Sequence, residues 1–256
     1  MIDADAPGAL APGLLARCAD AFAADPVARI ARNAVAKTDV RAVATNRDAV
    51  TRLTHTYSHT VVTGKSTSQN ASGRCWMFAG LNLFRMKAAA TLGLEEFELS
   101  QNHLMFWDKF EKANHFLESV LQTLDEPTGG RLLDWLCANP LQDGGQWDMF
   151  VNLVEKYGVV PKEAMPETQS SSNSGVMNAL VTLKLRQSAA ALRDAHAAGE
   201  DTAALRARKE AILPEVYRML ATHLGEPPRT FFWQWRDKER NFHRFSDTAP
   251  TEIYTS

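Results

Sequence analysis

Residues 64–90 read GKSTSQNASGRCWMFAGLNLFRMKAAA, a polar, glycine-bounded loop that runs directly into an apolar segment. From Cys75 onward the segment is apolar on nearly every side until Lys87, which predicts a helix that is buried all round. Gly93 follows as a residue suited to ending that helix. The sequence therefore predicts a central buried helix whose first residue is a cysteine at the end of a polar loop.

A cysteine in that place has the requirements of a nucleophile. The unpaired N–H groups and the dipole of a helix N-terminus stabilise a thiolate, and Arg74 adds a positive charge beside Cys75. An acyl-transfer site also needs donors for the developing oxyanion. We expect the backbone N–H of Cys75 to be one donor and the amide of Gln69 to be the other, with Gly73 allowing the loop between them to bend.

The rest of the chain is predicted to be mostly helical, with one pair of strands. Ser100 is a candidate N-cap for a long helix whose apolar residues run from 104 to 124. The spacing of apolar residues and the breaking residues Gly and Pro predict further helices over Leu14–Ala24, Leu132–Ala138, Trp147–Lys156, Val176–Ala198 and Thr202–Leu224. Pro214 is expected to kink or restart the last of them.

Three kinds of segment are predicted to be non-helical. Residues 48–62 and 159–161 are expected to be extended, and Gln169–Gly175 has the composition of a linker. The aromatic stretches Thr230–Trp235 and Phe242–Phe245 predict a strand pair. Their aromatic side chains, Phe231, Trp233 and Trp235, are expected to fill a core rather than to stack on bases.

Composition excludes several classes of protein. The chain has 256 residues, 45% of them hydrophobic, and a formal net charge of -2, which is ordinary for a globular protein and argues against a dedicated nucleic-acid binder. Its apolar run from Cys75 to Phe84 is too short to span a bilayer, and the N-terminus lacks the basic residues of a secretory signal. A cytoplasmic protein with no membrane contact is therefore expected.

Neither a disulfide framework nor a metal site is expected. Cys18, Cys75 and Cys137 lie far apart and form no CxxC pair. Cys18 and Cys137 fall among apolar neighbours on predicted helices and are expected to be inert. His55 and His59 are four residues apart, but no Glu follows His55 as in HExxH, so we expect no metal and no cofactor.

The motif Gln69-Asn-Ala-Ser-Gly-Arg-Cys75-Trp76 resembles the active-site segment of papain-like cysteine peptidases. Its continuation through Phe78 to Arg85 is similar to the bleomycin hydrolase and aminopeptidase C branch. Three further stretches resemble the same branch: Leu99–Lys109, Asp143–Met149 and Tyr157–Pro161. The resemblance extends from about Ile30 to the C-terminus.

The resemblance implies an α+β papain-like fold, here mainly its helical half with an inserted helical hairpin and without the barrel-like half. It implies that Cys75 is the nucleophile, Gln69 the oxyanion donor and Trp76 a packing residue behind the nucleophile. The backbone of Gly144 and Gly145 would pair with substrate. It further implies a peptide substrate with a free N-terminus, a cytosolic enzyme and a hexameric ring.

On this basis we divide the chain into four parts. Residues 1–62 are an N-terminal arm with an extended segment, and 63–168 are the helical catalytic half. Residues 169–245 are the helical insertion with its aromatic hairpin, and 246–256 return to the catalytic body. No histidine here matches the catalytic one of the family, whose chains are nearly twice as long, so we expect an N-terminal fragment that is nearly inactive alone.

Several alternatives remain open at this stage. Cys75 could be a buried structural thiol, Gln69 a mere hydrogen-bonding residue of its loop, and Gly144 and Gly145 simple turn residues. The alternative function is a catalytically inactive helical module that binds a partner or nucleic acid. In that case the contact would be made by arginines of the helical insertion, Arg186, Arg193, Arg206 and Arg208.

Overall fold

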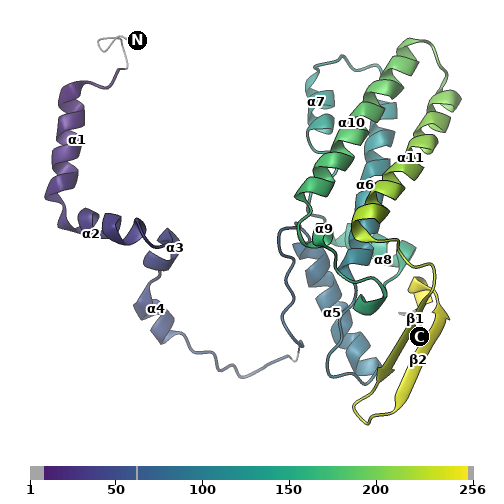
Figure 1. The fold of residues 1–256 in the computed structure, drawn as a ribbon, viewed down its shortest axis with the longest axis horizontal. Helices are drawn as coiled ribbons and strands as arrows, with labels where there is room; N and C mark the ends of the chain where they lie inside the picture. The colour runs from purple at the N-terminus through teal and green to yellow at the C-terminus, as the bar shows by residue number, and fades with distance from the viewer. Residues whose placement is uncertain (1–8, 62, 253–256) are drawn as a thin grey trace. The chain divides into compact units, whose positions relative to one another are not determined.

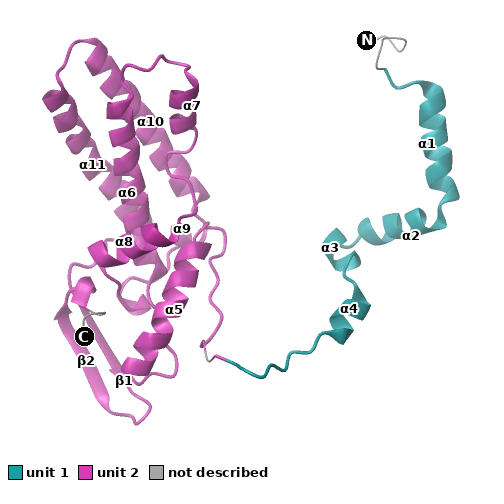
Figure 2. Cartoon of the chain, turned by 180° about the vertical axis from the view of Figure 1, so that it is seen from behind, with its two compact units in different colours: residues 1–60 teal, residues 61–256 magenta. Residues whose placement is uncertain are grey.

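The computed structural model describes residues 9–61 and 63–252. Contacts within the chain separate two compact units, Met1–Thr60 and Val61–Ser256 (Figure 2). The division falls close to the first boundary predicted from the sequence, and the predicted boundaries at 168 and 245 stay predictions. Within the described ranges, no helix is both long and apolar enough to cross a membrane.

The first unit consists of short helices with exposed side chains. They are α1 (Pro12–Ala24), α2 (Pro26–Val35), α3 (Val40–Val43) and α4 (Arg47–Arg52), and no residue of these four is buried. The helix predicted at Leu14–Ala24 is confirmed by α1. The extended structure predicted over 48–62 is wrong for its first residues, because the side chain of Asn46 accepts from the N–H of Ala49 and caps α4. Val62 lies outside the described residues.

The second unit is built around α6 (Gln101–Gln122), which packs against α5 (Cys75–Thr91), α8 (Trp147–Tyr157) and the hairpin of α10 (Gly175–Ala197) and α11 (Thr202–Leu224) (Figure 1). The predicted N-cap is confirmed: Ser100 Oγ accepts from the N–H of His103 at 3.1 Å. Short α7 (Arg131–Ala138) packs beside α6. Helix α11 continues through Pro214 and does not restart there.

Helix α5 begins at Cys75 and is followed by Gly93 with φ +66°, both as predicted. It is not buried all round, however. It packs against α6 and α8 and buries Met77 and Leu81, whereas Leu83 keeps 55% of its surface exposed. The apolar sequence of α5 does not show which side is exposed, because that depends on the elements that pack against the helix.

The segment Gln169–Gly175 is not a linker. Residues Gln169–Ser172 form the short helix α9, closed by a capping box in which Thr168 and Ser171 bond each other's backbone N–H. Ser171 is fully buried, and Asn173 forms a parallel bridge with Ala71. The Ser171 hydroxyl accepts from the N–H of Thr168, and the backbone of Ser172 and Ser174 bonds that of Ala71 in the loop before α5.

The last described residues form a pair of strands and then return to the helices. Strands β1 (Phe231–Arg236) and β2 (Phe242–Thr248) pair antiparallel, which confirms the predicted hairpin. A final short helix, Pro250–Glu252, follows, and the N–H of Val159 donates to the carbonyl of Pro250 at 3.0 Å. Gly158, with φ +69°, leaves no room for a side chain against that carbonyl group.

Candidate active site

Cys75 stands at the first position of α5 and is exposed. The preceding residue, Arg74, provides no side-chain cap, so the first-turn N–H groups of α5 have no side-chain acceptor. An anion placed there meets the positive end of the helix dipole. Because Cys75 is exposed, the alternative of a buried structural thiol is wrong for this structure.

Arg74 does not act as the free positive charge that the sequence suggested. Its side chain is 2% exposed and makes a bidentate ion pair with Glu167, with Nη1–Oε1 2.9 Å and Nη2–Oε2 2.7 Å. Burial raises the pKa of Glu167, but the hydrogen bonds and charge of Arg74 outweigh it and hold that pKa below its ordinary value. Glu167 compensates the charge of Arg74, and this ion pair fixes the position of the residue that precedes Cys75.

The loop from Gln69 to Gly73 is held by its neighbours. Ser72 Oγ donates to the Gln69 carbonyl at 2.6 Å and accepts from Arg74 Nε at 2.8 Å. The N–H of Ala71 donates to the Ser172 carbonyl at 3.0 Å. This path to Cys75 requires left-handed backbone at Asn70 and Gly73, with φ +52° and +61°. A loop fixed at both its backbone and its side chains positions the sulfur.

Gln69 itself is half-buried. Its side-chain oxygen Oε1 is buried and has no hydrogen-bond partner in the part of the chain that the structure describes, while its amide nitrogen donates to none of those residues. The amide N–H groups are therefore available as donors, as the predicted role requires. That role stays a prediction.

The structure brings Gly145 against Trp76 and Gly144 against Gly73, so it distinguishes between the two glycines. The N–H of Gly144 donates to the Gly73 carbonyl at 3.3 Å, and its own carbonyl accepts from Lys112 Nζ at 2.8 Å. The main-chain groups of Gly145 bond to no described residue. A Cβ on Gly145 would lie 2.7 Å from the ring of Trp76. Gly145 is thus the glycine with a free backbone beside the residue that follows Cys75.

Sequence reasoning missed the polar cluster beneath this glycine loop. Lys109 is 2% exposed, and its Nζ donates to the Leu141 carbonyl at 3.1 Å and to Asp143 Oδ1 at 2.9 Å. The pattern did contain a signal: Lys109 interrupts the buried stripe of α6 at helical spacing, between Phe106 and Ala113. A lysine in an apolar stripe needs a buried partner.

The other predicted features are spread over the chain. His55 and His59 are exposed, and the described residues contain no group of three or more His, Cys, Asp or Glu side chains that could hold a metal. Cys18 lies on α1 as predicted but is exposed rather than covered by apolar neighbours, and Cys137 is half-buried on α7. Neither cysteine stands at a helix start.

The arginines of the nucleic-acid alternative are engaged within the chain. Arg186 donates to the backbone carbonyls of the last two residues of α7, and Arg193 donates to the carbonyl of Thr123, just after α6. Arg206 pairs with Glu118, and Arg208 pairs with Glu200. The first three arginines hold the hairpin to α6 and α7, and the Arg208 pair lies within the hairpin, so these contacts give the alternative no support.

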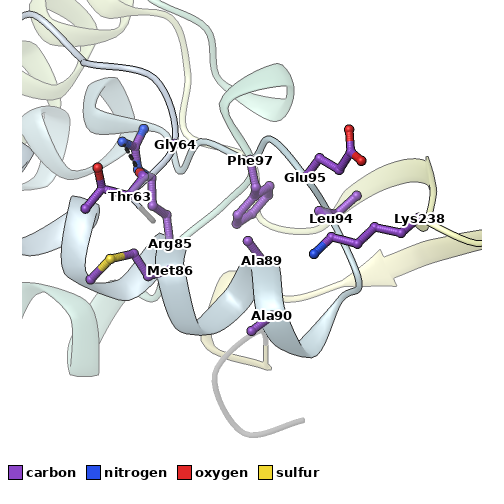
Figure 3. Close-up of a pocket in the computed structure, with 10 residues that line it drawn as sticks. All are labelled: Thr63, Gly64, Arg85, Met86, Ala89, Ala90, Leu94, Glu95, Phe97 and Lys238. Atoms are coloured by element: carbon purple, nitrogen blue, oxygen red, sulfur yellow. Dashed lines mark hydrogen bonds between the residues drawn. The ribbon is translucent and has the colours of Figure 1, made fainter. Parts of the chain in front are cut away.

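A cavity of about 200 Å³ lies at the opposite end of α5, away from Cys75 (Figure 3). Arg85 closes one side of it, with Nη2 donating to the carbonyls of Thr63 and Lys65 at 2.6 and 2.7 Å. Phe97 and the ammonium of Lys238 point into it from the other side. None of the predicted site residues lines this cavity.

Comparison with known proteins places this geometry in a family. Residues 10–256 match the Peptidase C1-like family. Aminopeptidase C of Listeria monocytogenes is 47% identical over 220 residues, which are 86% of this chain and 49% of that protein. Human bleomycin hydrolase is 39% identical over 234 residues, 90% of this chain and 51% of that protein.

A solved structure agrees with the sequence relatives. The crystal structure of PepW from Lactobacillus rhamnosis superposes with a TM-score of 0.89 at 43% identity, over 97% of this chain and 56% of that one. This confirms the papain-like fold in its mainly helical part. The chain spans about half the length of the curated relatives it matches. It belongs to the Peptidase C1-like family, on the branch of the aminopeptidases C and bleomycin hydrolases.

Proposed function

We propose that this chain carries the nucleophile half of a cysteine-type aminopeptidase that hydrolyses peptides with a free N-terminus. The observation that supports it best is the exposed sulfur of Cys75 at the uncapped start of α5, on a loop anchored by Arg74 and Ser72. The names of the relatives, aminopeptidase C and bleomycin hydrolase, agree with this chemistry.

In this proposal the Cys75 thiolate attacks the carbonyl carbon of the scissile peptide bond. The amide of Gln69 and the backbone N–H of Cys75 hold the oxyanion. The leaving amine takes a proton, and water then hydrolyses the thioester to regenerate the thiol. No metal or organic cofactor enters these steps.

The proposal assigns the general base to a residue outside this sequence, since the relatives are about twice as long. His103 is a poor base for the reaction. Burial lowers its pKa to about 4, and its Nε2 accepts from the indole N–H of Trp107 at 3.3 Å. We therefore expect this chain alone to be nearly inactive on aminoacyl-aminomethylcoumarin reporters. Turnover that disappears in Cys75→Ala would show that a base lies within these residues.

Thiol reactivity tests the nucleophile directly. Iodoacetamide at pH 7 is expected to label Cys75 at least about tenfold faster than the exposed Cys18 of the same chain, since only a stabilised thiolate reacts quickly there. Mass spectrometry of tryptic peptides gives all three cysteine rates in one experiment. Equal rates at Cys75 and Cys18 would overturn the proposed function, because exposure alone would then explain the labelling.

The same proposal includes the cellular location and the oligomeric state of the enzyme. A cytoplasmic enzyme assembled as a homo-oligomer, with six subunits as in its family, is the expected state. Sedimentation velocity of the protein at micromolar concentration tests the oligomer.

A further inference from the structure

Two lysines of α6 contact every residue of the segment that leads to Gly145. Lys109 donates to the carbonyl of Leu141 and to the carboxylate of Asp143. Lys112 donates to the carbonyls of Gln142 and Gly144, at 3.0 and 2.8 Å. Four successive residues of an irregular loop thus have their position set by two ammonium groups on one helix.

Lys112 has no spare hydrogen-bonding capacity. An ammonium carries three N–H donors, and here they are directed to Asp108, to Gln142 and to Gly144. Its side chain is 12% exposed, and burial lowers the pKa of Lys112 while it raises that of Asp108. Burying a charge pair gains little stability over an apolar pair of the same volume. The directed hydrogen bonds are what an apolar residue could not supply.

The bond to Gly144 fixes the direction of the next N–H group. The peptide between Gly144 and Gly145 is trans, so the carbonyl of the first and the N–H of the second lie in one plane and point in opposite directions. Because Lys112 holds the Gly144 carbonyl on its own side, the N–H of Gly145 is directed away from Lys112. The N–H of Gly144 is bonded to Gly73, which fixes the other end of the same residue.

The glycine loop and the nucleophile loop are also in direct contact. The side chain of Asp143 packs where a Cβ of Gly73 would stand, two residues before Cys75. The ring of Trp76 lies against Gly145 on one side and has the Lys112 ammonium 5.6 Å from its centre. The lysines therefore fix Gly145 relative to the sulfur, through contacts that do not involve the sulfur itself.

We propose that Lys112 is a positioning residue for substrate, which aims the backbone of Gly145 at the peptide bound to Cys75 by holding the Gly144 carbonyl. Lys109 supports it by holding Asp143 against Gly73. This assignment rests on the proposed function, since it takes the partner of Gly145 to be the backbone of a peptide.

Two alkylating reagents separate positioning from reactivity. Iodoacetamide needs only the thiolate, whereas Phe-Ala chloromethyl ketone also presents a peptide backbone with a free N-terminus. Both form a thioether with Cys75 and release halide. We define the preference as the ratio of the second-order rate for the chloromethyl ketone to that for iodoacetamide. For Lys112→Met this preference is expected to fall about tenfold, while the iodoacetamide rate changes by less than about twofold.

Three variants complete the test. Lys112→Gln, which is too short to reach the Gly144 carbonyl, is expected to lose the preference as well and serves if Lys112→Met does not fold by circular dichroism. Lys112→Arg retains donors and is expected to keep most of the preference. Lys184→Met, which breaks a partly buried pair with Glu215 on α11, is the control and is expected to leave it unchanged.

The outcomes distinguish the two proposals. A wild-type preference that survives in both Lys112→Met and Lys112→Gln overturns the positioning role. A fall in the iodoacetamide rate equal to that of the chloromethyl ketone also overturns it, since the loss would then lie in the thiolate. Absence of any preference in the wild-type chain, or labelling of Cys75 no faster than Cys18, counts against the proposed function itself.

Discussion

Replacing Arg74 by Met tests whether the ion pair before the nucleophile stabilises the fold. The guanidinium is 2% exposed, bonds both oxygens of Glu167 and the hydroxyl of Ser72, and lies 5.1 Å from the ring centre of Phe78. Removing one partner of a buried pair costs about 3–5 kcal/mol. Glu167 is 24% exposed and keeps the hydroxyl of Ser171, so we expect the lower end, about 3 kcal/mol.

Urea unfolding followed by circular dichroism measures this loss, and the melting temperature is expected to fall by about 6–12 °C for a unit of this size. The pH dependence gives an independent check. In the wild type the pKa of Glu167 is lowered by Arg74, so its contribution to stability is present above the unfolded value of 4.5 and is lost as the pH falls below it. Without Arg74, burial raises the pKa of Glu167, so protonation of Glu167 in acid removes the cost of burying its charge. The difference between the two proteins is therefore expected to shrink from pH 7 to pH 4.

Two further variants sharpen the test. Arg74→Met combined with Glu167→Gln removes the unpaired charge and is expected to recover about 1 kcal/mol or more of the loss. Arg208→Met, which breaks the exposed pair with Glu200, is the control and is expected to cause no measurable change. A loss below about 1 kcal/mol for Arg74→Met, or a deficit that grows in acid, would refute the reasoning.

Three other predictions follow from the packing and the charges. Gly145→Ala places a methyl group 2.7 Å from the ring of Trp76, and it is expected to destabilise the chain by about 1–3 kcal/mol in urea and to slow the chloromethyl ketone more than iodoacetamide. Unchanged rates for both reagents would contradict it. Gly80→Ala meets the ring of Phe150 at 2.6 Å and is expected to lose a similar amount of stability with no effect on the ratio of the two rates. Burial lowers the pKa of His103 from 6.5 to about 4, so stability is expected to fall by about 2 kcal/mol between pH 6.5 and 4.5 as the unfolded chain takes up the proton. His103→Gln is expected to remove most of that fall, and an unchanged pH profile would show that other groups cause it.

Element ends were the part of the fold that the sequence predicted best. Ser100 caps the start of α6 and Gly93 follows the end of α5, and both act through local backbone chemistry that can be read from neighbouring residues. The position of Cys75 at the start of α5 follows from the same local pattern. The hairpin of α10 and α11 was predicted because its apolar spacing is long and regular.

Errors arose where distant residues determine the structure. Arg74 was interpreted as a charge for Cys75, but its partner Glu167 lies 93 residues further along the chain. The composition of Gln169–Gly175 predicts a linker, but the backbone of Ser172 and Ser174 bonds that of Ala71, about 100 residues earlier in the chain. The roles of Lys109 and Lys112 depend largely on backbone carbonyls of a loop about 30 residues away, and carbonyls carry no sequence signature.

The return of the chain at Pro250 to the backbone of Val159 has a consequence for how this protein can vary. The hairpin of α10 and α11 begins after Thr168. The hydroxyl of Thr168 donates at 2.9 Å to the carbonyl of His223, near the end of α11. The start and the end of the hairpin therefore lie next to each other. The turn Ala198–Asp201 lies at the other end of the hairpin, so a change in its length is expected to disturb the Asp201 cap of α11 and to leave the sulfur of Cys75 in place.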